Sequence, residues 1–187
     1  MRQVRSWQRA LGVDIAVAVN VCPGQLGGPL TRQVQQALSG SGLAPDRLQL
    51  ELTERSLLDG GGAAERTIAA VRALGVRFVL DDFGTGYSSL TRLRRLPLSA
   101  VKLDRSFVAE LSEAGVDAAI VGAVVGLSKQ LGLGCTVEGI ETEQQRRTVS
   151  ALGTPYGQGF LFGRPTPAPE VPAVLARLGT HAAGVSP

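Results

Sequence analysis

Short apolar stretches that favour β-strands alternate along this chain with longer stretches that favour helices. The strand-like stretches are rich in Val and Leu, and the helix-like ones repeat apolar residues at helical spacing. The expected strands are residues 13–21, 47–52, 76–80, 100–103, 132–137 and 156–161. The expected helices are residues 30–39, 63–74, 88–93, 116–131 and 143–152, and a helical stretch carrying Trp7 opens the chain. This alternation indicates a parallel sheet covered by helices.

Polar side chains at the strand ends distinguish a closed barrel from an open, doubly wound sheet. Six of them lie at or near the C-terminal ends of six different expected strands: Asn20, Glu51, Asp81, Lys102, Glu138 and Gln158. Polar groups from many strand ends meet at the mouth of a (β/α)8 barrel, whereas an open sheet concentrates its site at one crevice. We therefore predict a TIM-like (β/α)8 barrel. A complete one has eight strands and about 250 residues, so six strand–helix units in 187 residues predict an incomplete barrel that lacks its front part.

The composition excludes several classes of protein. A content of 44% hydrophobic and 19% charged residues is typical of one globular domain. A net charge of +3 with scattered basic residues and 4% aromatic residues argues against a nucleic-acid polymer as partner. Cys22 and Cys135 have no metal-site spacing and are expected as reduced thiols, and His181 is the only histidine, which excludes histidine-based zinc sites. Because no membrane segment or signal peptide is recognisable, we expect a cytoplasmic protein.

Two adjacent carboxylates, Asp81 and Asp82, follow directly after the apolar stretch 76–80 and precede a loop rich in Gly and Ser. Neighbouring carboxylates at a strand end repel each other and lose hydration. The arrangement becomes favourable when a cation lies between them, or when loop amides and a nearby Lys compensate. The alternative interpretation is a strand that ends in a polar turn, since Asp, Gly and Ser are ordinary turn residues.

The wider set of strand-end residues favours the cation. Four side chains offer oxygen ligands: Asn20, Glu51, Asp81 and Asp82. Oxygen-only ligands suit Mg²⁺ or Mn²⁺ better than zinc. Lys102 is suited to hold a water or phosphate oxygen, Glu138 to orient or deprotonate that water, and Gln158 to hydrogen-bond a ligand. Such a cluster is typical of metal-assisted phosphodiester hydrolysis, with an enolase-like or aldolase-like barrel as the alternative.

Five ordered segments of the chain resemble the successive signatures of the EAL domain. They are Glu-Leu-Thr-Glu (51–54), Asp-Asp-Phe-Gly-Thr-Gly-Tyr-Ser-Ser-Leu (81–90), Lys-Leu-Asp-Arg-Ser-Phe (102–107), Val-Glu-Gly-Ile-Glu-Thr (137–142) and Gln-Gly-Phe-Leu-Phe (158–162). Residues 19–26 resemble a sixth element of that family. The resemblance covers roughly residues 3–169, so we predict a partial EAL domain over residues 1–169 and a C-terminal helix or tail over residues 170–187.

The resemblance implies a bacterial phosphodiesterase that linearises cyclic di-GMP to pGpG with Mg²⁺ or Mn²⁺. Asn20, Glu51, Asp81 and Asp82 match metal ligands of the family. Lys102 and Glu138 match the pair around the attacking water, with Glu138 as the base. Three further residues match supporting positions: Glu54 anchors the loop after Asp82, Gln158 lines the floor of the site, and Asp104 supports the ligands from behind.

The chain departs from the family at its front. The Glu-Ala-Leu on the first strand, whose Glu is a metal ligand, does not occur in this sequence. Two strands, that ligand and a nearby substrate-contacting arginine are therefore expected to be missing. Losing one ligand commonly lowers metal affinity or activity by about 10–100-fold. We accordingly expect an N-terminally truncated EAL domain with weakened hydrolysis, whose full-length protein carries sensor or cyclase domains upstream.

Two alternatives to an active phosphodiesterase follow from the missing strands. The first is a non-catalytic module that binds cyclic di-GMP or a partner protein. The second is a fragment that is inert alone, or that pairs with another copy to cover its open edge. By resemblance, the loop after Asp82 and the helix from Ser88 form the surface of such a homodimer. The intact Asp81, Asp82, Lys102 and Glu138 argue against a long-degenerated site.

Overall fold

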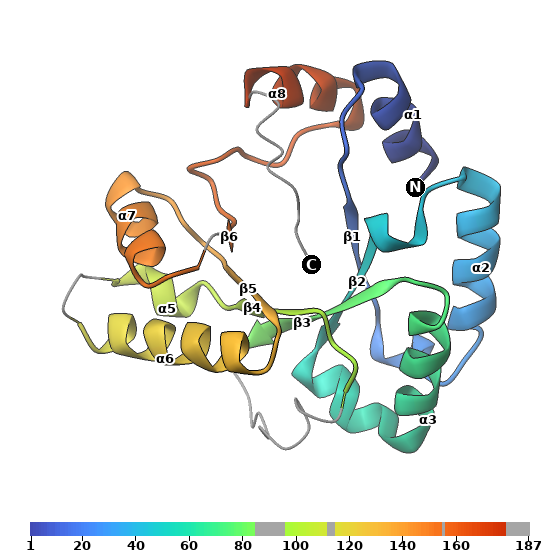
Figure 1. Ribbon diagram of the computed structural model, residues 1–187, viewed down its shortest axis with the longest axis horizontal. Coiled ribbons are helices and arrows are strands. Elements are labelled where there is room, and N and C mark those ends of the chain that lie inside the picture. Colours follow the sequence, from blue (N-terminus) through green and yellow to red (C-terminus); the bar gives the residue numbers. More distant parts are fainter. Residues whose placement is uncertain (85–95, 112–114, 155, 179–187) are drawn as a thin grey trace. The chain divides into compact units, whose positions relative to one another are not determined.

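Six β-strands in sequential order form the sheet of this protein, described by a computed structural model that covers residues 1–84, 96–111, 115–154 and 156–178 (Figure 1). The strands are β1 (Val17–Asn20), β2 (Leu48–Thr53), β3 (Arg77–Phe83), β4 (Ala100–Leu103), β5 (Gly134–Val137) and β6 (Tyr156–Gly157). The pairings of β1 with β2 and from β3 through β6 are parallel. This topology confirms the predicted TIM-like (β/α)8 barrel in its incomplete form.

Helices connect the strands and flank them at both ends of the chain. Their bounds are α1 (Arg2–Leu11), α2 (Leu30–Ser41), α3 (Glu54–Arg72), α5 (Ser106–Ala109), α6 (Val116–Gln130), α7 (Glu143–Ala151) and α8 (Val171–Arg177). Three short 3-10 turns, η1 (Pro23–Gln25), η2 (Pro45–Arg47) and η3 (Ala168–Glu170), complete the elements of the described residues. None of these helices is both long and apolar enough to cross a membrane.

The first of two compact units comprises Met1–Glu51, Ser56–Phe78 and the described part of Pro165–Pro187. In this unit β1 pairs with β2 from Val17 opposite Leu48 to Asn20 opposite Glu51. Arg47, just before β2, holds Asp14, just before β1, through two hydrogen bonds of 2.6 Å each. The inward residues of β2 are buried, whereas Val19 on β1 remains 42% exposed because β1 lies at the edge of the sheet.

The second unit comprises Leu52–Arg55 and the described part of Val79–Arg164. Here α6 packs on β4 and β5 and also contacts α5 and α7. Alternating apolar side chains form a fully buried core, in which Val101, Leu103, Val121 and Val137 have no exposed surface. Burial of this kind contributes about 25 cal/mol per Å² of apolar area. The core fixes the ends of β3, β4 and β5, and these ends carry the predicted site residues of this unit.

Several element bounds differ from those expected. β6 ends four residues earlier than the expected 156–161. Just beyond it, Gly159 lies directly against the backbone of Ile140, an approach that leaves no room for a side chain. β1 begins at Val17 rather than at residue 13. Glu54–Arg72, labelled α3, is divided at Gly61, whose φ of 49° and ψ of −146° are not helical, so its second part begins close to the expected residue 63 and its first part was not expected. The expected helix 88–93 lies outside the described residues.

Candidate functional site

A β-bulge places Asp81 and Asp82 at the end of β3. Leu80 pairs with Val101 of β4, but the next paired residues are Phe83 and Leu103, so both aspartates stand opposite the single residue Lys102. Asp82 takes the left-handed conformation, with φ of 53°. In a regular strand successive side chains point to opposite faces, and a bulge re-aims one of them. The bulge therefore explains how two consecutive carboxylates reach the same site.

Lys102 pairs with two of three neighbouring carboxylates. Its Nζ is 2.5 Å from Glu138 Oε1 and 3.1 Å from Asp81 Oδ1. One carboxylate oxygen from each of Asp81, Asp82 and Glu138 lies within 4.8 Å of the others. Lys102 is only 8% exposed. The group thus contains one ammonium and three carboxylates, which leaves an excess of negative charge in a partly buried site.

Burial raises the pKa of Asp82 above its ordinary value. The charges of Asp81, Asp104 and Glu54 add to this effect, and Lys102 acts in the opposite direction. Asp104 differs, because hydrogen bonds from the side chain and backbone of Ser106 lower its pKa despite burial. Asp104 thus remains ionised behind Asp82 and contributes to the negative field there.

The residues present fit a hard divalent cation. All candidate ligand atoms are oxygens, the donor type that Mg²⁺ and Mn²⁺ prefer. Asp81 Oδ1 is buried and, although 3.1 Å from Lys102 Nζ, makes no hydrogen bond of acceptable geometry among the described residues. A buried carboxylate oxygen without a well-aligned donor is costly in an apo site. A cation bound among the oxygens of Asp81, Asp82 and Glu138 would remove that cost.

The start of the loop after Asp82 is held from two sides. Glu54 Oε1 accepts a hydrogen bond of 3.2 Å from the backbone N–H of Gly84. On the other side, a Cβ built on Gly84 would lie 2.7 Å from the ring of Phe107, so only glycine fits there. Gly84 also has a φ of 100°, which glycine adopts without strain. The predicted anchor Glu54 thus contacts the segment that the sequence assigned to it, and Phe107 packs opposite.

Glu138 begins the loop after β5, and backbone contacts tie this loop to both neighbouring strands. Its N–H donates to Leu103 O at 3.0 Å. On the other side Gln158 N donates to Val137 O at 2.8 Å, and Ile140 N donates to Gln158 O at 3.0 Å. Gln158 therefore takes part through its backbone, and its role at the floor of the site stays a prediction.

Asn20 and Glu51, the two other predicted ligands, belong to the first unit. They stand opposite each other at the ends of β1 and β2, and Val21 N donates to Glu51 O at 2.9 Å. Glu51 is 9% exposed, and Asn20 is exposed. Both side chains are thus adjacent at the C-terminal ends of their strands, as predicted from the sequence. Their participation in one cation site with Asp81 and Asp82 stays a prediction.

Three contributors to the site were not predicted from the sequence. Phe107 and Arg105 pack against the loops that follow Asp82 and Glu138, and Gln145 hydrogen-bonds the second of these loops. The spacing Thr142…Gln145 is a capping-box pattern, which is a signal for Gln145. Phe107 and Arg105 lie in the segment 102–107 that resembles the EAL domain, but that resemblance did not indicate which glycine lies against each of them.

Comparison with known proteins yields a consistent family. The sequence model of the EAL domain matches residues 1–165. The bifunctional diguanylate cyclase/cyclic di-GMP phosphodiesterase MucR of Pseudomonas aeruginosa is 42% identical over 176 residues, which is 94% of this chain and 26% of MucR. The cyclic di-GMP phosphodiesterase RocR of the same organism is 38% identical over 158 residues, 84% of this chain and 40% of RocR. The chain therefore spans well under half the length of these relatives.

Solved structures agree with the sequence relatives. The PaMucR phosphodiesterase in complex with c-di-GMP superposes with a TM-score of 0.84 at 42% identity, covering 91% of this chain and 74% of the other. A manganese/cy-diGMP complex of Klebsiella pneumoniae BlrP1 gives a TM-score of 0.77 at 32% identity, covering 87% of this chain and 42% of the other. BlrP1 has also been solved as a calcium complex. With a match over residues 1–165, relatives of this similarity and the shared fold, this chain belongs to the EAL domain family.

Proposed function

We propose that this chain hydrolyses cyclic di-GMP to linear pGpG in a reaction that depends on Mg²⁺ or Mn²⁺. The observation that carries the proposal is the cluster of Asp81, Asp82 and Glu138 around Lys102. Relatives named as cyclic di-GMP phosphodiesterases support the substrate. The manganese complex of BlrP1 supports the type of metal.

The metal ligands in this proposal are Asp81 and Asp82, joined by Asn20 and Glu51. A bound divalent cation supplies Lewis acidity, which makes a water more acidic and neutralises charge on the phosphate oxygens. Asp82 is suited to this role because burial and its acidic neighbours disfavour its charge until a cation arrives. The bulge contributes by presenting both aspartates to the same side of β3.

Glu138 is the proposed general base, and Lys102 holds it in place. Lys102 Nζ, 2.5 Å from Glu138 Oε1, favours the ionised form that accepts a proton. Glu138 takes one proton from a water whose oxygen attacks phosphorus. The bond from phosphorus to the ribose 3′ oxygen then breaks, and that oxygen receives a proton from solvent. The product is a linear dinucleotide with a 5′-phosphate, and Lys102 stabilises the charge that develops beside it.

Hydrolysis by the 187-residue chain tests this proposal. The chain is incubated with cyclic di-GMP and either Mn²⁺, Mg²⁺ or EDTA, and pGpG is measured by reversed-phase chromatography. We expect product with either metal and none with EDTA. Glu138→Gln should lower kcat by about 10²–10⁴-fold, the usual contribution of a general base.

The matched control is Glu143→Gln, which makes the same change at an exposed position on α7 where Glu143 pairs only with Arg146 among the described residues. It should retain the wild-type kcat. Absence of pGpG with both metals, or full activity in Glu138→Gln, would contradict the proposal. Tight binding of cyclic di-GMP without metal and without turnover would favour the non-catalytic module instead.

The remaining predictions about the wider protein stay proposals. A cytoplasmic location is supported by the free thiols of Cys22 and Cys135, since reduced cysteines are typical of that compartment. Upstream sensor or cyclase domains are supported by the greater length of the relatives. The proposed homodimer surface includes the helix from Ser88, which lies outside the described residues. The domain boundary at residue 169 also stays a prediction.

A further inference from the structure

The side-chain amide of Gln145 contacts two different loops of the second unit. Its Oε1 accepts hydrogen bonds from the backbone N–H groups of Glu141 at 2.9 Å and Thr142 at 3.0 Å. Its Nε2 donates to the carbonyl oxygen of Val108 at 2.9 Å. The first two contacts hold the loop after β5, and the third reaches α5 in the connection after β4. The amide oxygen therefore bonds the loop after β5, and the amide nitrogen bonds the connection after β4.

The oxygen and the nitrogen of this amide make different kinds of contact. The contact with Thr142, together with the 3.2 Å bond from Gln145 N to Thr142 Oγ1, is a capping box that begins α7. A Glu at this position would cap the helix equally well, because only an acceptor is required. The bond to Val108 O requires a donor, which Glu lacks. Capping alone does not explain why this position carries an amide.

The bond to Val108 joins the connection that follows β4, the strand of Lys102, to the loop that begins with Glu138. These loops already meet at their inner ends, where Glu138 N donates to Leu103 O at 3.0 Å. Next along them, Gly139 lies so close to Arg105 that a Cβ on Gly139 would be 3.1 Å from Arg105 Cα. The bond from Gln145 Nε2 to Val108 O is a third contact between these two segments, and it lies further from the strand ends. A bond at this point is suited to restrain the angle at which the loop leaves β5, on which the position of Glu138 depends.

We propose that Gln145 is a positioning residue that holds Glu138 against Lys102 by bonding the loop after β5 to α5. The proposal rests on the proposed function, because it assigns Gln145 to the alignment of the proposed base. Among the described residues, the side chain of Gln145 bonds Glu141, Thr142 and Val108 and not the carboxylate cluster. Its influence passes through the four residues from Glu138 to Glu141, a path short enough for a small rotation of the loop to move the carboxylate. Loss of a group that orients an active-site residue typically lowers activity about 10–100-fold.

Two substitutions separate positioning from capping. Gln145→Glu keeps the acceptor for Glu141 and Thr142 but places an oxygen opposite the Val108 carbonyl. Gln145→Ala removes both contacts. We expect both variants to lower kcat about tenfold or more with KM within about twofold, since alignment of the base affects the chemical step. Gln145→Ala should lower the urea midpoint more than Gln145→Glu does, because it loses the helix cap as well as the bond to Val108.

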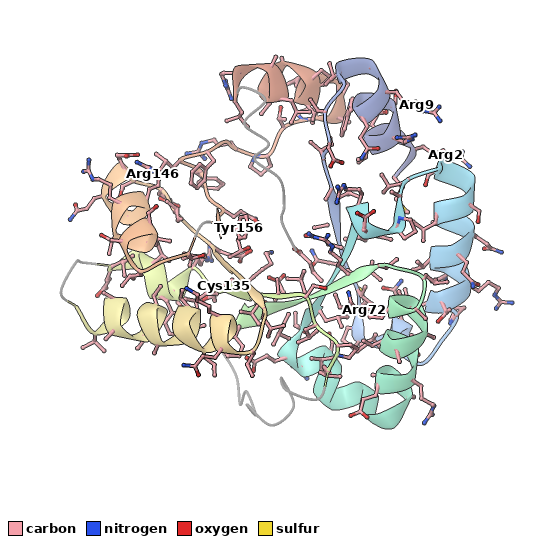
Figure 2. The ribbon with its side chains drawn as sticks, viewed as in Figure 1. Arg2, Arg9, Arg72, Cys135, Arg146 and Tyr156 are labelled. Carbon is pink, nitrogen blue, oxygen red and sulfur yellow. The ribbon has the colours of Figure 1, made fainter. Side chains whose placement is uncertain are left out.

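The control is Arg146→Gln, one residue further along α7. It changes the net charge by the same amount as Gln145→Glu, and Arg146 is an exposed side chain at the outer surface of the helix (Figure 2). It should leave kcat at the wild-type value. Wild-type kcat in Gln145→Glu, with loss only in Gln145→Ala, would overturn the proposal and leave Gln145 as a helix cap.

Amide hydrogen exchange in the metal-free chain provides a readout that does not depend on catalysis. If Gln145 holds the loop, the Glu138 amide should exchange about tenfold faster in Gln145→Glu than in wild type and Arg146→Gln. Unchanged exchange would overturn the inference whatever the activity. If wild-type chain gives no pGpG, the proposed function fails, and exchange alone then decides the role of Gln145.

Discussion

Asp82 combines two unfavourable features at one residue. Its left-handed backbone, with φ of 53°, costs roughly 1–2 kcal/mol for most residues, although Asp tolerates it better than others. Its carboxylate is disfavoured by burial and by Asp81, which together raise its pKa. A carboxyl group whose pKa rises on folding adds stability at low pH that is lost as pH rises through its folded pKa. At neutral pH, Asp82 therefore destabilises the metal-free chain.

Asp82→Asn should stabilise the metal-free chain. Asn tolerates the left-handed conformation as well as Asp does, and it removes the buried charge. We expect the thermal midpoint at pH 7 in EDTA to rise by about 2 °C, the shift that ~0.5–1 kcal/mol produces in a domain of this size. Thermal denaturation followed by circular dichroism measures it. Asp117→Asn, at the first turn of α6, should instead lower the midpoint slightly by weakening the helix start. A lower midpoint in Asp82→Asn would contradict this explanation.

The connection after β4 supports two loops through a short helix. Phe107 of α5 lies against Gly84, Arg105 just before α5 lies against Gly139, and the Val108 carbonyl accepts a hydrogen bond from Gln145.

The alternation of strands and helices was predictable because burial imposes periodic apolar residues. The bulge was not predictable, because it depends on how β3 pairs with β4 and not on β3 alone. The helix α5 had no periodic signal of its own, because its four residues make little more than one helical turn.

Gly84→Ala should destabilise the second unit. The new Cβ would lie 2.7 Å from Phe107 Cε2, and the φ of 100° is strained for any residue with a side chain. Overpacking and backbone strain of this kind cost about 1–3 kcal/mol each. Urea denaturation measures the change in the free energy of unfolding. The control is Gly126→Ala, inside α6 with open space around it, which should stabilise the chain by about 0.5–1 kcal/mol. An unaffected free energy in Gly84→Ala would mean that Phe107 moves aside at no cost.

At the scale of the whole molecule, the predicted ligands come from both compact units. Asn20 ends β1 and Glu51 lies near the end of β2 in the first unit, and Asp81 and Asp82 lie near the end of β3 in the second. These positions were predictable because each polar residue follows an apolar stretch of sequence. The distances between ligands of different units were not predictable, because they depend on how strands separated by whole helices are arranged.

Glu51→Gln tests the contribution of the first unit to the metal site. We expect Mn²⁺ affinity to fall by about 10–100-fold, as for loss of any single ligand. The rise in thermal midpoint with Mn²⁺ concentration measures affinity, since a ligand stabilises the folded state by RT ln(1 + [L]/Kd). Glu65→Gln, at an exposed position on α3 in the same unit, should bind Mn²⁺ like wild type. Equal affinity in Glu51→Gln and Glu65→Gln would contradict the four-ligand prediction.

The outer side of β1 makes protein concentration a variable in any experiment on this chain. A strand at the edge of a sheet offers backbone N–H and C=O groups to any other strand, and natural proteins usually protect such an edge with charged residues or proline. The residues Val17–Asn20 contain neither, and Val19 is 42% exposed. Midpoints and rates should therefore be compared between variants at one fixed dilution, because chains that meet edge to edge would add the stability of their association to that of their fold.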